Sequence, residues 1–331
     1  MHSPLHADRM PMTAIQSKPP NGGPTEHGQR ARSALIDIRM RLEYAGLRLL
    51  VVIVRAFPLD TGVAISARLW RWTARLNRRH ARALENLALA FPDKTPRERE
   101  RIALQMWENL GRVMAETMQL DRILADPGRI EIADQHIYDR YAGKFGPVIG
   151  VSLHMGNWEL AIWPLTRAGA SPAAVYRTVK NPYVDQYLRD QRRDLYPGGL
   201  LGKGKVDGSR EAGQNTARLI MDFVRRGGRL GLVCDLYDKQ GIAVPFFGHP
   251  AKSVAIAGMI ARRVGARIWM ARCLRVGKGS RFRIELKELK VPRTANAGED
   301  VKTITAAMQA QFEAWIRQAP EQWMWSNRRW K

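Results

Sequence analysis

The stretch Pro147-Val-Ile-Gly-Val-Ser-Leu-His-Met-Gly-Asn-Trp-Glu159 decides the fold, because a strand, a turn and the beginning of a helix follow one another in it. The apolar run from Pro147 to Leu153 has the length and composition of a buried strand. His154 comes directly after this run, Gly156 permits a sharp turn, and Asn157 fits the N-cap of a helix. The sequence therefore predicts that His154 lies at the edge of a sheet, where a strand ends.

The same pattern of strand and helix recurs through the second part of the chain. Short apolar runs alternate there with amphipathic segments that are predicted as helices. The runs cover 173–177, 229–235 and 267–276, and the helices lie near 158–168, 181–195, 210–226 and 253–264. This alternation predicts an α/β domain over residues 129–331, with a largely parallel central sheet flanked by helices and with ligands at the carboxyl ends of the strands.

Two regions precede this domain. Residues 1–32 are rich in Pro, Gly, His and Gln and lack the apolar core of a secretory signal, which predicts a disordered extension. Residues 33–128 begin with a stretch that is apolar and basic together, so we predict an N-terminal helical region that associates with a membrane.

The membrane prediction depends on the uninterrupted apolar run from Leu49 to Val54, which lies between Arg48 and Arg55. This run is too short to span a bilayer, since a spanning helix needs about 20 apolar residues. An interfacial helix fits better, with its arginines on lipid phosphates and with Trp70 and Trp72 at the headgroup boundary. The alternative is a core-packed helix flanked by solvated arginines.

A second helix is predicted in the same region. Thr95, Pro96 and Glu98 correspond to an N-cap, a first-turn proline and the acid of a capping box. The helix is expected to run to about Ala125, before Pro127-Gly128. Its apolar side chains recur at helical spacing, a pattern typical of packing, so we expect a structural role.

Composition limits the classes of partner. The 331 residues include 54 Lys and Arg against 31 Asp and Glu, a formal net charge of +23 that favours anionic partners. Nucleic acid is not predicted, because the sequence has neither zinc-finger spacing nor an RRM-type aromatic motif. Cys234 and Cys273 lie in separate apolar runs, which argues against a disulfide framework and predicts a reducing compartment. No residue clustering indicates a metal or a cofactor, so neither is predicted.

His154 and Glu159 are the main candidates for chemistry. Glu159 falls in the first turn of the predicted helix, where the helix dipole favours the ionised carboxylate. A carboxylate close to an imidazole fixes its tautomer and stabilises the imidazolium, so the pair predicts a general base with its orienting group. Ser152 has no GxSxG motif around it, and neither cysteine has an evident His partner, so a covalent intermediate is not favoured.

Together with several other segments, this region resembles the lipid A late acyltransferases, the lauroyl and myristoyl transferases of the lysophospholipid acyltransferase superfamily. The superfamily signature is a His, four residues and then an acid, and His154 and Glu159 match that spacing. The resemblance runs from about Leu35 to Lys331 and includes, in the family's order, Asn86-Leu-Ala-Leu-Ala-Phe-Pro92, Tyr176-Arg177 with Asn181-Pro182, Asp235, Val244-Pro-Phe-Phe-Gly248 and Gln322-Trp-Met-Trp-Ser-Asn-Arg-Arg-Trp-Lys331.

The resemblance implies an α/β acyltransferase in which His154 and Glu159 are catalytic. It also implies that a fatty acyl thioester, on acyl carrier protein or CoA, is the donor, and that a hydroxyl of a lipid A precursor is the acceptor. In the glycerolipid branch Asn typically precedes the His and Asp is the acid. Here Leu153 and Glu159 occupy those positions, which favours the lipid A branch. A glycerolipid or a glycosylated inositol lipid is the alternative acceptor.

Three further residues are candidates for substrate binding. Arg177 follows a strand-like run and fits either a phosphate or oxyanion contact or an ordinary surface position. Arg210 is a candidate because it opens a helix after the Gly- and Lys-rich loop 199–208, in which Lys203 and Lys205 would either meet substrate phosphate or be solvated. Asp235 ends an apolar strand and therefore points to the same edge as His154, where the resemblance also indicates a site position; structural capping is the alternative.

Two segments allow two interpretations each. Residues 244–248 are apolar and would either wall an acyl-chain pocket or pack in the core. The C-terminal segment would either lie at a lipid headgroup boundary or seal the domain by packing. It combines these aromatic and basic residues: Trp323, Trp325, Arg328, Arg329 and Trp330.

The resulting expectation is a monotopic or peripheral enzyme on the cytoplasmic face of a bacterial inner membrane. Its positive charge would attract both an acidic carrier protein and an anionic membrane lipid. The alternative from another class is a basic membrane-binding or lipid-carrying protein without catalysis, in which the spacing of His154 and Glu159 is incidental.

Overall fold

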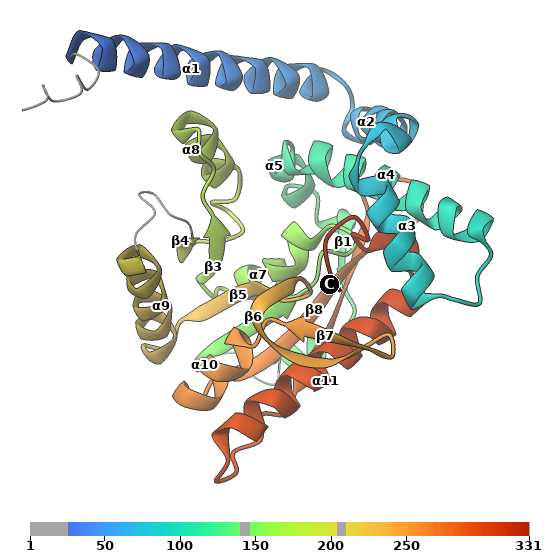
Figure 1. The fold of residues 1–331 in the computed structure, drawn as a ribbon, viewed down its shortest axis with the longest axis vertical. Coiled ribbons are helices and arrows are strands. Elements are labelled where there is room, and N and C mark those ends of the chain that lie inside the picture. Colours follow the sequence, from blue (N-terminus) through green and yellow to red (C-terminus); the bar gives the residue numbers. More distant parts are fainter. Residues whose placement is uncertain (1–25, 140–145, 204–209, 331) are drawn as a thin grey trace, which may run out of the picture.

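A central sheet dominates the computed structural model, which describes residues 26–139, 146–203 and 210–330 (Figure 1). Its seven strands follow the order β1-β9-β8-β2-β5-β3-β4. Every neighbouring pair is parallel except β8 and β9. The bounds are β1 (Ile130–Ile132), β2 (Val148–Ser152), β3 (Pro172–Arg177), β4 (Gly199–Lys203), β5 (Arg229–Val233), β8 (Arg267–Arg275) and β9 (Phe282–Leu289). The predicted α/β class with a largely parallel sheet is confirmed.

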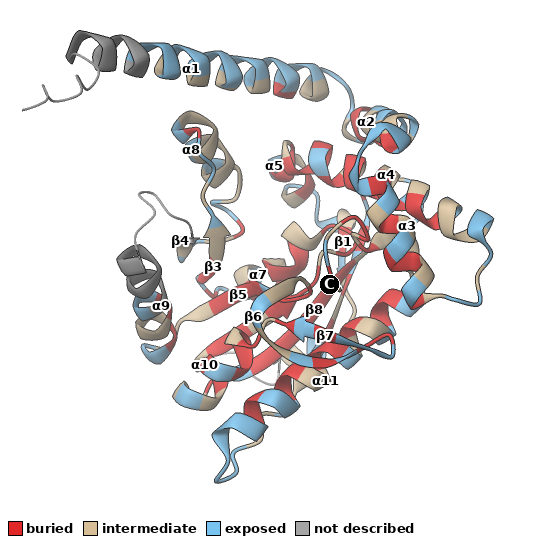
Figure 2. Cartoon of the chain, viewed as in Figure 1, coloured by how far each residue is buried: buried red, intermediate tan, exposed pale blue. Residues whose placement is uncertain are grey.

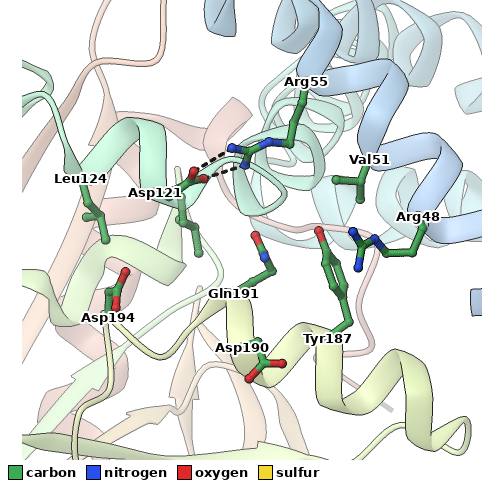
Figure 3. Close-up of a pocket in the computed structure, with 10 residues that line it drawn as sticks. Arg48, Val51, Arg55, Asp121, Leu124, Tyr187, Asp190, Gln191 and Asp194 are labelled. Atoms are coloured by element: carbon green, nitrogen blue, oxygen red, sulfur yellow. Dashed lines mark hydrogen bonds and ion pairs between the residues drawn. The ribbon is translucent and has the colours of Figure 1, made fainter.

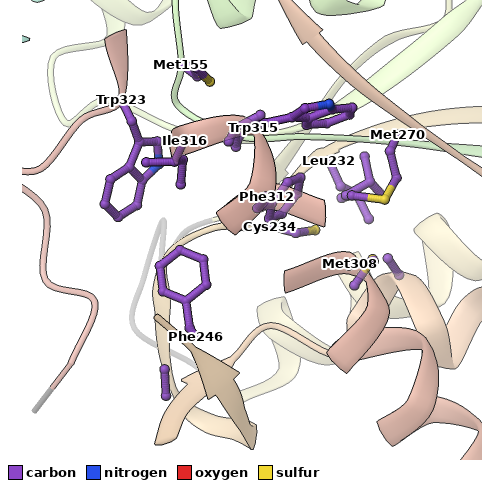
Figure 4. Packing of buried hydrophobic residues seen from close by; sticks show 14 of the residues in the cluster. Met155, Leu232, Cys234, Phe246, Met270, Met308, Phe312, Trp315, Ile316 and Trp323 are labelled. Atoms are coloured by element: carbon purple, nitrogen blue, oxygen red, sulfur yellow. The ribbon is translucent and has the colours of Figure 1, made fainter. Parts of the chain in front are cut away.

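Apolar side chains cover both faces of this sheet. One cluster, part of which is seen in Figure 4, joins the strands to helices on one face. These helices are α3 (Arg79–Ala90), α4 (Pro96–Thr117), α9 (Arg210–Arg225), α10 (Ile256–Val264) and α11 (Ala297–Gln318). The other cluster includes the 3-10 helix η3 (Trp158–Ile162), α5 (Leu120–Leu124) and α7 (Trp163–Arg167). Strands buried on both faces are continuous apolar runs in sequence.

The strands that the sequence predicted are those that form continuous apolar runs. The four predicted runs correspond to β2, β3, β5 and β8. The sequence did not predict β1, β4 and β9, nor the separate antiparallel pair β6 (Tyr237–Phe246) and β7 (His249–Ser253). Strand β9 alternates apolar and charged residues, and its burial alternates accordingly, so it contains no continuous apolar run.

The turn between β6 and β7 belongs to the packed core. Phe246 is fully buried and Phe247 is 5% exposed. Phe247 has φ +51, a left-handed conformation that is uncommon outside glycine. The Glu313 carboxylate accepts the N–H of Phe247 at 2.6 Å, and the Arg317 guanidinium lies 4.5 Å from the centre of its ring. The sequence left residues 244–248 as either the wall of an acyl-chain pocket or part of the core. The rings of Phe246 and Phe247 are packed in the core.

Two helices, α1 (Glu26–Ala56) and α2 (Leu59–Thr73), begin the described chain. Residues 1–25 of the predicted extension lie outside the described residues, and α1 starts within the remainder of it. Pro58 separates the two helices, since proline cannot donate a helical hydrogen bond. In Figure 1, α1 extends as a long helix past the end of α8 (Pro182–Gln191), and Figure 2 shows much of it exposed.

The exposed side chains of α1 and α2 are largely apolar. The exposed large apolar residues from this region are Leu35, Ile36, Ile38, Leu42, Leu49, Leu50, Val52, Ile53, Phe57, Ile65, Leu69, Trp72 and Leu76. Trp72 is 82% exposed, whereas Trp70 stacks on Trp107 with 6.1 Å between ring centroids. The run from 49 to 54 is therefore mostly exposed, in contrast to the core-packed alternative. Within the described ranges, no helix has both the length and the hydropathy of a membrane span.

Helix α4 begins as predicted but ends earlier. Its capping box is formed, because Thr95 Oγ1 accepts the N–H of Glu98 and the Glu98 carboxylate accepts the N–H of Thr95. The predicted end near Ala125 is wrong, since α4 ends at Thr117 and the short α5 follows separately. Directly after the end of α4, the carbonyl of Met118 accepts a hydrogen bond from Arg55 of α1 at 3.2 Å. This long-range contact lies beyond what helical periodicity can predict.

Polar side chains attach α1 to α8. The Tyr183 hydroxyl donates to Asp37 at 2.8 Å, and Asn181 Nδ2 donates to Glu43 at 3.1 Å. Asn181 also caps α8, because its Oδ1 accepts the N–H of Tyr183. The N-terminal helix is therefore joined to the α/β domain at the beginning of α8.

Candidate active site

Adjacent strands bring His154 and Asp235 to the same edge of the sheet. Strand β2 ends at Ser152 and β5 ends at Val233, and these two residues are register partners. His154 and Asp235 each follow two residues after the strand end. Because parallel strands end at one edge, the two side chains meet there.

Asp235 holds His154 through both carboxylate oxygens. The distance from His154 Nδ1 to Asp235 Oδ1 is 2.8 Å, and the backbone N–H of His154 donates to Oδ2 at 2.9 Å. The Asp235 side chain is fully buried, while that of His154 is 20% exposed. Since an ionised carboxylate can only accept, Nδ1 carries the proton, and Nε2 is the basic nitrogen.

Burial and charge act in opposite directions on the pair. Burial alone would lower the pKa of His154, but the charge of Asp235, the hydrogen bond to it and the weaker influence of Glu159 raise that pKa above its ordinary value. Burial would raise the pKa of Asp235, but the charge of His154 and the hydrogen bonds from His154 and Trp323 hold it below its ordinary value. The result is an ionised carboxylate beside an imidazole that readily accepts a proton.

The carboxylate that is hydrogen-bonded to His154 belongs to Asp235, whereas the sequence suggested Glu159 for this place. Glu159, in η3, instead accepts two hydrogen bonds from Arg192, from Nε at 2.8 Å and from Nη2 at 2.6 Å. Both side chains are nearly buried. A bidentate contact occupies both carboxylate oxygens, so Glu159 influences His154 through its charge.

The other two predicted binding residues, Arg177 and Arg210, belong to the neighbouring elements β3 and α9. Arg177 is exposed at the end of β3, which pairs with β5 and so ends at the same edge of the sheet. Arg210 is the first residue of α9, and its side chain lies outside the described residues, as does the loop from 204 to 209. Among the candidates whose side chains are described, the structure brings His154 and Asp235 into contact, and Glu159 acts on His154 through its charge.

The C-terminal segment, residues 323–330, contributes a residue that the sequence did not predict for the site. Trp323 Nε1 donates to Asp235 Oδ2 at 2.7 Å, and the N–H of Met324 donates to the carbonyl of His154 at 3.0 Å. Trp323, Trp325 and Arg329 are at most 1% exposed, and Figure 4 shows Trp323 as part of the buried cluster. These side chains therefore seal the domain, so the alternative of a headgroup boundary does not hold for them.

The turn after His154 requires glycine at position 156. Gly156 has φ +56, and a Cβ atom built on it would lie 1.7 Å from the carbonyl oxygen of Cys273. No side chain fits at that distance. The next residue, Asn157, donates its N–H to the same carbonyl at 3.2 Å. Strand β8 therefore fixes the path of the chain immediately after the imidazole.

The His154–Asp235 pair can accept one proton and stabilise the resulting charge. His154 Nε2 accepts the proton, and the Asp235 carboxylate stabilises the imidazolium. The Trp158 ring packs against the imidazole edge to face, with 5.2 Å between the ring centroids. Throughout the described ranges, no three His, Cys, Asp or Glu side chains are grouped so as to hold a metal ion.

A separate crevice of about 330 Å³ lies between α1, α5 and α8 (Figure 3). Arg55 and Asp121 form a two-fold ion pair in it, with both N–O distances at 2.7 Å. Apolar, acidic, basic and polar side chains line the rest, including Leu124, Asp194 and Arg48. Neither His154 nor Asp235 lines this crevice, so it is distinct from the candidate active site.

Comparison with known proteins gives two matches. The family model described as bacterial lipid A biosynthesis acyltransferase matches residues 31–331. The chain is also 26% identical over 312 residues to the lipid A biosynthesis lauroyltransferase of Escherichia coli (strain K12). That alignment covers 90% of this chain and 94% of the relative.

We expect the isosteric substitution Asp235→Asn to lower the pKa of His154. The substitution removes the charge that raises this pKa, while the burial that lowers it is unchanged. NMR titration of the His154 imidazole measures the effect. Asp238→Asn, which changes a carboxylate on β6 that accepts the N–H of Gln240, should leave the titration of His154 unchanged. A His154 pKa that is the same in wild type and Asp235→Asn would show that Asp235 does not control the imidazole.

Proposed function

Because the chain belongs to the bacterial lipid A biosynthesis acyltransferase family, we propose that this acyltransferase moves a fatty acyl chain from an acyl thioester to a hydroxyl of a lipid A precursor. The observation that carries the proposal is the His154–Asp235 pair at the carboxyl edge of the sheet, within a family match over residues 31–331. A partly exposed imidazole backed by a buried carboxylate is the base that transfer to a hydroxyl needs.

In the proposed reaction, His154 Nε2 takes the proton of the acceptor hydroxyl while the hydroxyl oxygen attacks the thioester carbonyl carbon. A C–O bond forms, and the carbonyl electron pair moves onto the oxygen of a tetrahedral intermediate. When the carbonyl re-forms, the C–S bond breaks and the departing thiolate takes the proton from the imidazolium. The products are an ester and a thiol, and His154 is neutral again.

Two carboxylates support this base in different ways. Asp235 orients the ring and fixes the tautomer, because it accepts the Nδ1 proton and the backbone N–H. Glu159 adds negative charge that favours the imidazolium, although Arg192 neutralises part of it. Arg177 and Arg210 are the proposed contacts for phosphate on the acceptor, as exposed or helix-initiating arginines near the same edge.

Acyl carrier protein is the proposed donor, with acyl-CoA as the alternative. The net charge of +23 favours association with an acidic protein and with an anionic lipid, chiefly by raising the association rate. The E. coli relative is a lauroyltransferase of lipid A biosynthesis by name, which supports a fatty acyl donor and a lipid A acceptor here. A glycerolipid or a glycosylated inositol lipid is the alternative acceptor within the superfamily.

The proposed location is the cytoplasmic face of the inner membrane, with α1 and α2 on the bilayer surface. The support is their exposed apolar side chains, of which Leu42 and Leu49 are 68% and 62% exposed. Burial of such side chains in the acyl region is favourable by about 1.5–3 kcal/mol each. The arginines of the same helices would contact lipid phosphates.

The test of the function is transfer from radiolabelled acyl carrier protein to a panel of lipid acceptors. Wild type is expected to acylate a lipid A precursor, and His154→Ala to lower kcat by about 10²- to 10⁴-fold, the usual contribution of a general base. Transfer only to a glycerolipid or an inositol lipid would replace the acceptor proposed here. A fully active His154→Ala would refute the mechanism.

The two carboxylates can be ranked by kinetics. Asp235→Asn should approach the loss of His154→Ala, because the ring loses its orientation and its tautomer. Glu159→Gln should keep at least about ten times more activity than Asp235→Asn, since only a charge effect is lost. Asp238→Asn serves as the neutral control. The opposite order, with Glu159→Gln inactive and Asp235→Asn active, would make Glu159 the orienting group.

Membrane attachment can be tested on the exposed face of α1. The triple variant Leu42→Ser, Leu49→Ser and Ile53→Ser should weaken binding to vesicles of phosphatidylethanolamine and phosphatidylglycerol by at least about tenfold. Co-sedimentation measures the bound fraction. The matched control changes two exposed apolar residues elsewhere, Leu219→Ser and Met259→Ser, and should bind like wild type. Equal binding of all three proteins would exclude this face of α1 as the attachment surface.

A further inference from the structure

Buried side chains of helix α4 hold the turn that follows His154. Asn109 Nδ2 donates to the carbonyl of Gly156 at 3.1 Å, and Asn157 Nδ2 donates to Glu116 Oε2 at 2.9 Å. Asn109 and Glu116 are seven positions apart and so lie on the same side of the helix. One face of α4 therefore contacts two consecutive residues of the turn.

Glu116 is the centre of these contacts. It is fully buried in the last turn of α4 and forms an ion pair with Arg275 of β8 at 2.5 and 2.8 Å. Ser280 Oγ donates to the same carboxylate at 2.8 Å. The four hydrogen bonds, counting that from Asn157, occupy both oxygens and fix the direction of the carboxylate.

The ion pair is difficult to explain by stability alone. Removing two charges from water is unfavourable, and the attraction between Glu116 and Arg275 offsets this only in part, so well-packed apolar side chains at such positions are often equally stable. What a saturated ion pair does provide is a fixed direction for each hydrogen bond. Here one of those bonds is directed at the turn after His154.

Asn157 depends on this carboxylate for its position. The residue is fully buried, and within the described residues its Oδ1 atom has no hydrogen-bond partner. The contact with Glu116 is therefore the one that orients its side-chain amide. Arg275 also connects to Asn109 through Nε, at 3.3 Å, so both contacts of α4 with the turn share one guanidinium.

We infer that Glu116, held by Arg275, is a positioning residue that sets the place of His154 through Asn157 and the turn 155–157. The inference rests on the function proposed above, in which His154 is the general base. Because the imidazole is only three residues before Asn157, a shift of the turn moves His154 relative to Asp235 and to the substrate. A displacement of about 1 Å in such a group can lower a rate about 100-fold.

The experiment compares Glu116→Gln, Asn157→Ala and the double variant with wild type in the full-length protein. Each single variant should lower kcat by about 100-fold with little change in KM. The double variant should lose no more than the more impaired single variant, because both act through one contact. The low-field NMR resonance of the His154 Nδ1 proton should shift or broaden in all three.

A second ion pair on β8 provides the matched control. Arg272, three residues before Arg275, pairs with Glu285 at 2.6 Å and extends to Gln318, away from the turn. Glu285→Gln should lower Tm, while kcat and the His154 resonance stay at wild-type values. If Glu116→Gln behaves in the same way, with lower Tm, unchanged kcat and an unshifted resonance, its role is structural and the inference fails.

Two further outcomes keep the inference separate from folding and from the proposed function. If Glu116→Gln does not fold, the Asn157→Ala variant provides the test, because Glu116 keeps its contacts with Arg275 and Ser280 in that variant. An unshifted His154 resonance together with wild-type kcat in Asn157→Ala overturns the inference. If wild type transfers no acyl group to a lipid A precursor, the proposed function fails. The NMR comparison of the variants still supports or overturns the positioning role.

Discussion

The buried carboxylate of Asp235 is the constraint on which the site depends. A charge without access to water requires hydrogen-bond donors, and Asp235 has three: the ring and the backbone N–H of His154, and the indole of Trp323. These donors belong to the end of β2 and to the C-terminal segment, while the acceptor follows β5. One carboxylate thus joins two neighbouring strands and the end of the chain, and the requirement to satisfy it fixes how these three parts meet.

The site contains two acidic residues whose surroundings give them different properties. Asp235 is fully buried and contacts the imidazole directly, so the two pKa values move in opposite directions and the pair is ready to bind a proton on the ring. Glu159 has its charge largely compensated by Arg192, whose own pKa is raised by Glu159. The sequence spacing of His and acid brings Glu159 near the base, but proximity along the chain does not decide which carboxylate receives its proton.

The sequence predicted those parts of the fold that short-range patterns determine. Continuous apolar runs identified the four adjacent strands β8, β2, β5 and β3, and the position of Asp235 after one of them placed it at the edge with His154. The partners that complete the site are distant in sequence. Trp323 is 88 residues from Asp235, and Asn157 is 41 residues from Glu116. A tryptophan near the C-terminus and a glutamate on an amphipathic helix carry no local signal of such contacts, because burial creates their role.

Helix α8 connects the proposed membrane surface to the site. Its first residues contact α1 through Asn181 and Tyr183, and its last turn ends beside Arg192, which binds Glu159. Ten residues of helix span about 15 Å. If α1 lies on the bilayer, α8 leads from the surface to Arg192 and so to Glu159, whose charge acts on His154. The residues that α8 exposes are Pro182, Gln186 and Asp190, and an amide and a carboxylate do not enter the acyl region. The proposed attachment to the bilayer therefore ends at α1, and α8 links it to the site from outside the acyl region.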